Sequence, residues 1–293
     1  MCSGHIDTWL ELLNIDSLGN VEPKFWHASD IDLSAVPEAR VIEQDVKRTR
    51  ADEIFYSSEK TRQVMLQALL RYCAFFRICY MQGLNEILAP LLSLNANFDS
   101  KHNEKGTPQQ PERINDALTD AGQVLSTSVG QIDDEDTVSD WTHVEVLDTE
   151  FDVHLAVFEK LMERLAPVTF STEGVQALQS QLASFHMLLY YFEADLASFL
   201  AREGMTADIY APPWFITVFA RRAPVNIALH LWARLLRSNK PHLVIFLGVA
   251  LMQVNKKLLM NISSELLPET IVRLHFKSIV DLDEIFGRVC MCS

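Results

Sequence analysis

A short polar stretch, residues 80–86 (Tyr-Met-Gln-Gly-Leu-Asn-Glu), interrupts one of the most apolar regions of the chain. From residue 59 to about residue 78, apolar side chains recur at spacings of three and four, which predicts a helix with one buried face. Apolar residues resume at Leu84, and Gly83 lets the backbone turn or approach a neighbour closely. Gln82 is therefore expected on a corner between two anchored helices, which present its side chain outward.

A second candidate, Arg48, lies in residues 38–55, which hold the only concentrated basic stretch of an acidic protein. Asp45 precedes Arg48 by three residues, so in a helical turn the two side chains would share a face and could form an ion pair. An exposed pair of this kind contributes only about 0 to 1 kcal/mol to stability. Taken alone, Arg48 could be half of such a pair, and Gln82 could be a corner residue that bonds its own backbone.

The sequence lacks the common motifs of self-contained enzymes. It has no G-x-x-x-x-G-K-[ST] phosphate-binding loop, no G-x-G-x-x-G after a strand, no H-E-x-x-H and no G-x-S-x-G. The nine histidines are scattered, and none pairs with a cysteine at metal-ligand spacing. The acidic run 133–136 lacks the glycine and the terminal glutamate of a calcium loop. We therefore expect no metal site, no cofactor of its own and no self-contained hydrolase, kinase or metalloenzyme activity.

Composition predicts an all-α protein. Hydrophobic residues make up 48% of the 293 residues, glycine is scarce, and apolar stripes of helical period run along most of the chain. A net charge of −14 argues against nucleic-acid binding and against electrostatic docking to an anionic membrane. The aromatic residues Trp214, Phe215, Phe219 and Trp232 are predicted to be core.

The sequence also predicts a cytoplasmic protein. The five cysteines include no C-x-x-C pair, which indicates free thiols in a reducing compartment, and the first residues do not resemble a signal peptide. The longest apolar run, residues 243–252, is shorter than the ~20 residues that span a bilayer, so no transmembrane segment is expected. The ending Cys290-Met291-Cys292-Ser293 formally matches a prenylation box; the alternative is that the domain simply ends there.

Residues 97–150 differ sharply from the rest of the chain. They contain 13 Asp or Glu and three Lys or Arg, with two prolines and runs of Gln, Ser and Thr. This composition predicts a long acidic, disordered insertion within one large helical domain, rather than a folded half. The insertion is interpreted as a solvated linker, with a regulatory or partner-binding loop as the alternative.

Three stretches resemble one known family, the TBC-domain proteins, which are GTPase-activating proteins for Rab GTPases. The pattern Ile42-x-x-Asp45-x-x-Arg48-Thr49 is similar to their arginine motif, and Tyr80-x-Gln82-Gly83-Leu84-Asn85 is similar to their glutamine motif. The later signature is matched by Phe199, Gly204, Tyr210, Trp214, Phe215, Phe219, Pro224 and Trp232. The resemblance covers about residues 1–96 and 150–260, so it implies one TBC domain over residues 1–293 with the insertion at 97–150.

The resemblance implies a trans-acting mechanism. GTP hydrolysis is slow in a GTPase alone, and an arginine supplied in trans can be worth ~10³ to 10⁵ in rate. Arg48 would be the arginine finger, whose planar guanidinium group bridges phosphate oxygens. Gln82 would be the glutamine finger, which positions the attacking water. Asp45 would orient the Arg48 loop and Tyr80 would help hold the corner. The remaining motif residues are implied as supporting or GTPase-contacting positions: Asn85, which would also hold the corner, Ile42, Thr49 and Gly83.

The implied partner is a GTP-bound Rab GTPase, which would itself bind GTP and Mg²⁺ and could recruit the chain peripherally to endomembranes. Some positions depart from the family pattern. Glu43 and Lys47 stand where the family usually has proline, which predicts a less rigid finger loop, while Pro213 and Ala233 replace a usual arginine and aspartate. The basic neighbours Lys47 and Arg50 leave a shifted register for the finger open. A functional alternative is a non-catalytic module that tethers a GTPase or trafficking partner without activating it.

Overall fold

The computed structural model describes residues 5–15, 23–29, 31–33, 36–94, 149–167, 169–171, 173–240 and 242–292. All regular elements in these ranges are helical, which confirms the predicted all-α class. In chain order they are α1 (Ile6–Leu13), α2 (Ala39–Arg48), α3 (Ile54–Ser57), α4 (Glu59–Phe76), α5 (Leu84–Leu92), the 3-10 helix η2 (Thr149–Phe151), α7 (Asp152–Leu165), α8 (Gly174–Phe192), α9 (Ala194–Arg202), α10 (Ala207–Tyr210), α11 (Pro212–Ile216), α12 (Val225–Ser238), α13 (Leu243–Asn261), α14 (Leu267–Val272) and α15 (Ile279–Cys292).

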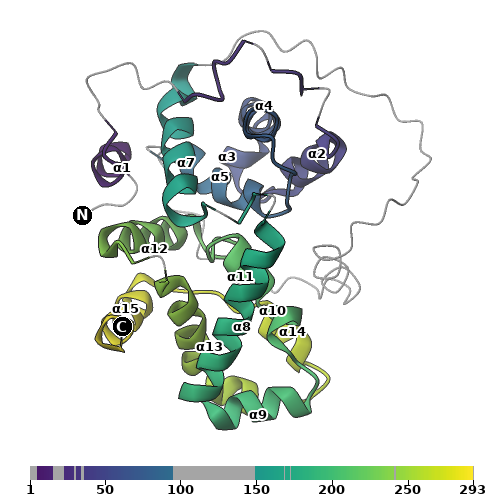
Figure 1. Ribbon diagram of the computed structural model, residues 1–293, viewed down its shortest axis with the longest axis vertical. Helices are drawn as coiled ribbons and strands as arrows, with labels where there is room; N and C mark the ends of the chain where they lie inside the picture. The colour runs from purple at the N-terminus through teal and green to yellow at the C-terminus, as the bar shows by residue number, and fades with distance from the viewer. Residues whose placement is uncertain are drawn as a thin grey trace, which may run out of the picture.

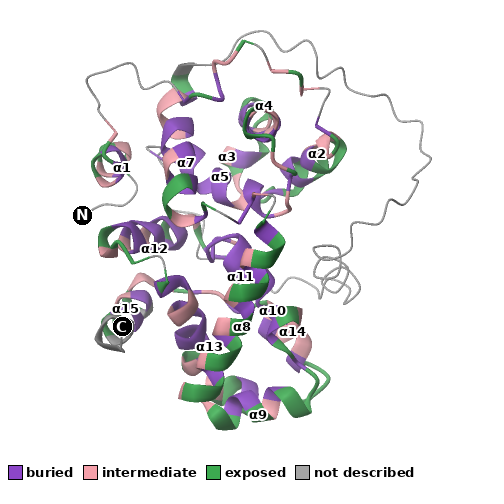
Figure 2. Cartoon of the chain, in the orientation of Figure 1, coloured by how far each residue is buried: buried purple, intermediate pink, exposed green. Residues whose placement is uncertain are grey.

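The helices form two groups that share one core (Figure 1). The upper group contains α2, α3, α4, α5 and α7, with α4 and α7 packed on α5. The lower group contains α8, α9, α10, α13 and α14, in which α13 packs along α8. Between them lie α11, which contacts α8 and α13, and α12, which contacts α1, α5, α7 and α15. Figure 2 shows α5 almost wholly buried, whereas α8 and α9 present exposed residues outward.

The helix before the polar stretch forms as its pattern predicts. The Ser58 hydroxyl caps α4 by accepting a hydrogen bond from the amide of Thr61 at 3.4 Å. The helix ends at Phe76 because Arg77 adopts a left-handed conformation (φ 53°), and the amide of Ile78 then bonds the carbonyl of Cys73 at 3.1 Å. The chain therefore leaves α4 in a fixed direction just before the corner at residues 80–83.

The predicted aromatic core is confirmed. Trp214, Phe215, Phe219 and Trp232 are all buried, and the indole nitrogen of Trp232 donates to the carbonyl of Val218 at 2.9 Å. Trp214 and Phe215 lie on α11, Trp232 lies on α12, and Phe219 lies between these helices.

The prediction that Arg48 lies in a loop is wrong, because Arg48 is the last residue of helix α2. Glu43 and Lys47 occupy the positions where proline is usual, and their side chains form an i,i+4 ion pair at 2.8 Å on this helix. Since neither residue interrupts the backbone hydrogen bonds as proline would, the segment is a regular helix and not a flexible loop.

Helix α13 extends nine residues beyond the apolar run at 243–252. It has 19 residues and a mean hydropathy of 1.6 over its best window, so by length and composition alone it could cross a membrane. Half of that window is buried inside the domain, against helices that include α8 and α15. Core helices of folded domains can have the same length and hydropathy, so these two properties do not distinguish a membrane-spanning α13 from a core helix.

Several expectations fall outside the described residues. The predicted insertion, residues 97–150, is described only at its last two residues, where Glu150 pairs with Lys60 of α4 at 2.5 Å. The side chains of residues 288–293, which include the prenylation-like ending, are not described either. Of the cysteines that are described with their side chains, Cys73 is buried, Cys79 is exposed, and both are free thiols.

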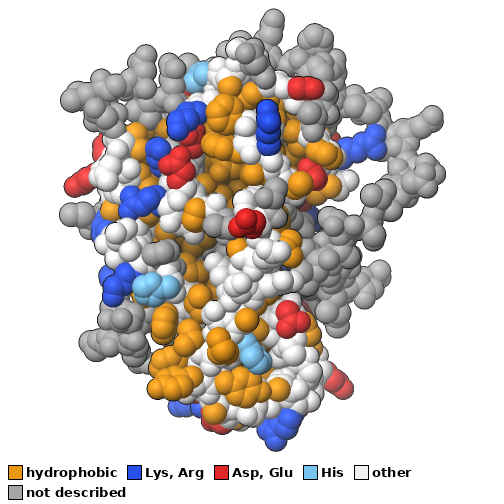
Figure 3. Space-filling view, in the orientation of Figure 1, with side chains coloured by type: hydrophobic (Ala, Val, Ile, Leu, Met, Phe, Trp, Pro, Cys, Tyr) orange, Lys and Arg blue, Asp and Glu red, His pale blue; other side chains and the backbone are white. Residues whose placement is uncertain are grey.

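On the face shown in Figure 3, hydrophobic side chains gather over the lower helices. Helix α8 contains no charged residue, and Met187, Tyr190 and Tyr191 near its C-terminal end are exposed. This apolar surface belongs to the lower group of helices, whereas α2 and α5 lie in the upper group (Figure 1).

Candidate functional site

The carboxylate of Asp45 joins the two candidate residues. Asp45 lies in the last turn of α2 and is 1% exposed. Its Oδ1 atom is 2.6 Å from Nη2 of Arg48 and accepts a hydrogen bond from Nε2 of Gln82 at 3.2 Å. Side chains from the end of α2 and from the corner before α5 therefore reach one oxygen atom, so the spatial convergence that the two motifs require is present.

Tyr80 secures the other oxygen of this carboxylate. Its hydroxyl donates to Oδ2 of Asp45 at 2.7 Å and lies 3.2 Å from Oδ1 of Asn85. Burial, and then the charge of Asp45, raise the pKa of Tyr80 well above its ordinary value. The hydroxyl therefore remains a donor at any pH at which the protein would work, and it holds Asp45 in place.

Asn85 closes the cluster from the first turn of α5. Its Oδ1 accepts from the amide of Gly83 at 3.0 Å, and its Nδ2 donates to the hydroxyl of Thr49 at 2.7 Å. Thr49 in turn donates to the backbone carbonyl of Asp45 at 2.5 Å. The end of α2 is thus bonded to the corner through buried side chains, each of which has a partner.

Gly83 is the position that sets the shape of the corner. Its φ is +116°, which side chains of L-residues rarely allow, and a Cβ atom there would lie 2.9 Å from Cγ2 of Ile216 and 3.0 Å from Cγ2 of Thr217. The corner is therefore seated directly on the end of α11, and only glycine fits both the conformation and the space.

Exposure separates the candidate residues into two kinds. The Arg48 side chain is 57% exposed and Gln82 is partly exposed, whereas Ile42, Asp45, Thr49, Tyr80, Gly83 and Asn85 are buried. Their burial fits the supporting role that the resemblance implies, whereas a contact with a GTPase stays a prediction. They act on the site by holding the backbone and the two exposed side chains.

Of the two neighbouring basic residues, the enclosed Arg50 does not fit the shifted register. Lys47 is paired with Glu43 on the surface of α2. The Arg50 side chain is only 9% exposed, and its Nη2 donates to the backbone carbonyls of Ala220 and Ala223, each at 3.1 Å. Sequence reasoning treated Arg50 only as a substitute for Arg48, and no local pattern indicates that its side chain turns inward.

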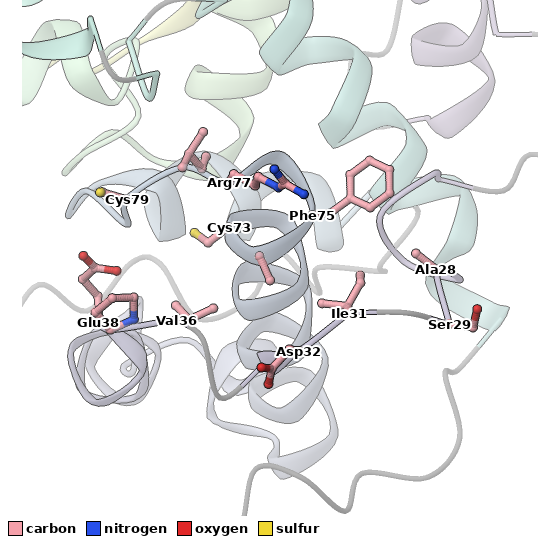
Figure 4. Close-up of a pocket in the computed structure, with 13 residues that line it drawn as sticks. Ala28, Ser29, Ile31, Asp32, Val36, Glu38, Cys73, Phe75, Arg77 and Cys79 are labelled. Carbon is pink, nitrogen blue, oxygen red and sulfur yellow. The ribbon is translucent and has the colours of Figure 1, made fainter.

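An open groove with a volume of about 790 Å³ adjoins the corner (Figure 4). It lies between residues 28–29, 31–32 and 36–38 on one side and the C-terminal end of α4 on the other, and Cys73, Arg77 and Cys79 are among its lining residues. Burial, with the charge of Glu38 acting in the same direction, raises the pKa of Cys73 to about 12. This thiol is therefore protonated, which makes it a poor nucleophile and a poor metal ligand.

The site has the chemistry to complement an anion supplied from outside. The guanidinium of Arg48 can bond two oxygens of a phosphate at once, and the Gln82 amide offers both an acceptor and a donor. Among the described residues, no group of three or more His, Cys, Asp or Glu side chains is arranged to hold a metal ion.

The sequence and the helical fold have counterparts among known proteins. The sequence matches the Rab-GTPase-TBC domain family over residues 9–260, which is most of its length. The chain belongs to this family of Rab GTPase-activating proteins. The match ends near the C-terminus of α13, so α14 and α15 lie beyond it.

The individual relatives are distant. The TBC domain-containing protein kinase-like proteins of Homo sapiens and Gallus gallus are each 28% identical over 250 residues, which is 84% of this chain and 21% of each relative. The GTPase-activating protein GYP5 of Saccharomyces cerevisiae is 30% identical over 120 residues, covering 40% of this chain and 12% of GYP5. The chain therefore spans less than a quarter of the length of these relatives.

Solved structures show the same fold. The crystal structure of the Ypt/Rab-GAP domain of Gyp1p aligns with a TM-score of 0.62 at 16% identity, covering 98% of this chain and 81% of that one. The Chlamydomonas flagellar RabGAP TBC domain aligns with a TM-score of 0.60 at 14% identity, covering 97% of this chain and 77% of that one.

Proposed function

We propose that this chain accelerates GTP hydrolysis by a Rab-family small GTPase, and that it does so by supplying Arg48 and Gln82 in trans. One observation carries the proposal: both side chains, from different elements, bond Oδ1 of the buried Asp45. They are also the more exposed members of an otherwise buried cluster. A pair held this way is preorganised, so a docked GTPase would meet both groups at once.

In the proposed reaction, Arg48 exchanges the carboxylate of Asp45 for oxygens of the transferring phosphoryl group. Its charge then offsets the negative charge that develops in the transition state, which the partner alone compensates poorly. Gln82 accepts a hydrogen bond from the attacking water and donates to the phosphoryl group or to the GTPase backbone. Asp45 keeps its bond from Tyr80 while Arg48 moves, so the buried carboxylate retains a donor.

The partner in this scheme is the GTP-bound form of the GTPase, which brings both GTP and Mg²⁺. The activator needs no cofactor of its own and is not a self-contained enzyme. We place its action in the cytoplasm, with recruitment to endomembranes through the partner rather than through a membrane segment of this chain.

A second candidate function is a tether that binds a GTPase or trafficking partner without activating it. The specific observation that favours it is the short ion pair between Arg48 and Asp45, because an arginine engaged in this way could be purely structural. The two functions differ in whether removal of Arg48 affects hydrolysis or only stability.

The test is a hydrolysis screen over a panel of GTP-loaded Rab proteins, followed by substitutions on the responding pair. Arg48→Ala is expected to lower the stimulated rate by about 10³-fold or more, and Gln82→Ala by about 10²-fold or more. Matched controls are Lys47→Ala, which removes an exposed cation one residue away, and Gln63→Ala, which removes an exposed glutamine bonded to Glu59 on α4. Both controls should stimulate like the wild type.

Circular dichroism and thermal unfolding show whether each variant is folded. Equal stimulation by the wild type and a folded Arg48→Ala variant would refute the catalytic role of Arg48. If the wild type bound a GTP-loaded Rab protein but stimulated hydrolysis by no member of the panel, the tether would be the correct function.

A further inference from the structure

We propose that Arg50 is a positioning residue for the finger pair: its guanidinium fixes the end of α2 and the first turn of α5 to the loop of residues 217–223. This inference rests on the proposed function, because it concerns how Arg48 and Gln82 are held for the same reaction. Arg50 itself would not touch the partner or its nucleotide, since its side chain is only 9% exposed.

The backbone of Arg50 turns its side chain into the protein. Its φ is +47°, a conformation that is uncommon for a residue other than glycine. The guanidinium then reaches residues far along the chain, and Nη2 donates to the carbonyls of Ala220 and Ala223. A costly backbone conformation of this kind persists when surrounding contacts require it, and here it delivers the guanidinium to those two carbonyls.

Two carboxylates balance the buried charge of this guanidinium. Oε1 of Glu53 is 3.4 Å from Nη1, and Oε2 of Glu86 is 3.7 Å from Nε. Glu86 lies in the first turn of α5, four residues after Gln82. One cation therefore contacts the segment that follows Arg48, the helix that follows Gln82 and the loop after α11. A buried charge without such partners would be strongly destabilising, so the cluster favours a single arrangement of these three segments.

The loop that Arg50 holds also supports the corner. Thr217, its first residue, packs against the position where Gly83 would carry a Cβ. The next two residues, Val218 and Phe219, have φ values of +47° and +61°, which are unfavourable for bulky side chains. Only contacts from elsewhere can keep them there, and Arg50 supplies two of these at Ala220 and Ala223. Without the bonds from Arg50, the loop could change conformation and move Thr217, against which Gly83 packs. Gln82, the neighbour of Gly83, would then move as well.

Lysine cannot replace arginine at this position. Its ammonium keeps the charge but is a single point, whereas the planar guanidinium bonds both carbonyls through Nη2 while Nη1 faces Glu53 and Nε faces Glu86. Displacement of a catalytic group by about 1 Å can lower the rate by about 10²-fold. The substitution Arg50→Lys therefore tests geometry while it retains the charge.

The experiment measures kcat and KM for a responding GTP-loaded Rab protein with the full chain and its variants. Arg50→Lys is expected to lower kcat by about 10-fold to 10²-fold while KM changes by less than about 3-fold, because the docking surface is intact. Arg71→Lys is the matched control: Nη1 of Arg71 also donates to two carbonyls, those of Trp26 at 3.1 Å and Ala28 at 3.2 Å, on a different segment. It should destabilise the fold comparably without lowering kcat.

A double substitution distinguishes a positioning role of Arg50 from a purely structural one, because only a positioning role makes the loss of kcat depend on the finger residue. If Arg50 acts by positioning Gln82, then Arg50→Lys should lower kcat much less in the Gln82→Ala background than in the wild type. Equal losses in the two backgrounds would overturn the inference, as would an unchanged kcat in Arg50→Lys or a parallel loss of kcat in Arg71→Lys. By contrast, a wild-type kcat in Arg48→Ala would overturn the proposed function itself, so the two failures are distinguishable.

Discussion

The substitution Gly83→Ala adds one methyl group at the point where the corner rests on α11. Alanine at a φ of +116° carries backbone strain of about 1 to 2 kcal/mol. The new Cβ would also lie 2.9 Å from Ile216 Cγ2 and 3.0 Å from Thr217 Cγ2, and overlap of this kind costs typically about 1 to 3 kcal/mol. Less the gain of about 0.4 to 1 kcal/mol from a less flexible unfolded chain, we expect a loss of about 1 to 4.5 kcal/mol in the free energy of unfolding, and a displaced Gln82.

Gly204→Ala is the matched control. Gly204 also has a positive φ, +72°, but no atom lies within 4 Å of where its Cβ would be. This control carries the strain without the overlap, so it should lose about 1 to 3 kcal/mol less stability than Gly83→Ala. Both variants have the same benefit from a less flexible unfolded chain, about 0.4 to 1 kcal/mol, which cancels in the comparison.

Urea unfolding followed by circular dichroism measures the stability difference, and stimulated GTP hydrolysis measures the effect on the corner. The double variant Gly83→Ala/Thr217→Ser removes the Cγ2 atom that the new Cβ meets while it keeps the hydroxyl that accepts from the amide of Arg221. It should recover part of the lost stability. If Gly83→Ala were no less stable than Gly204→Ala, the close seating of the corner on α11 would be refuted.

Two further predictions concern the parts of the fold around the site. Trp232→Phe leaves the carbonyl of Val218 without its indole donor, whereas the buried indole nitrogen of Trp214 has no hydrogen-bond partner among the described residues. In urea unfolding, Trp232→Phe should therefore cost about 1 to 3 kcal/mol more than Trp214→Phe, and equal losses would contradict the assigned bond. Burial lowers the pKa of His154 from its usual 6.5, so between the folded pKa and 6.5 the unfolded chain binds more protons than the native state. Wild-type stability should accordingly fall as the pH drops below 6.5; His154→Gln should show a smaller fall between pH 7.5 and pH 5.5, and an identical pH dependence would exclude His154 as its source.

Local patterns account for much of the fold. Apolar periodicity predicted α4 to within two residues of its end, since side chains at spacings of three and four share one helix face. The same kind of reasoning placed Asp45 and Arg48 on one face of a helical turn, and their ion pair bears this out. It did not reveal that this turn ends a regular helix, because the resemblance suggested prolines that the chain lacks at 43 and 47.

The candidate site could be predicted only in part. The two motifs name Arg48, Gln82 and the residues around them, and the convergence of both side chains on Asp45 agrees with that reading. The motifs did not distinguish the exposed residues from those, such as Ile42, that are fully enclosed. Burial depends on what packs above a residue, and that information lies elsewhere in the chain.

By itself, the sequence determined the helical class, the aromatic core and the two motifs, because each depends on residues close together along the chain. Tertiary structure alone decided how the motifs are held. Arg50 reaches carbonyls some 170 residues away, and Gly83 must be glycine because Ile216 and Thr217 lie against it. Contacts of such long sequence separation leave no periodic signal, so only the folded chain shows that the corner, the end of α2 and the loop after α11 form one supporting unit.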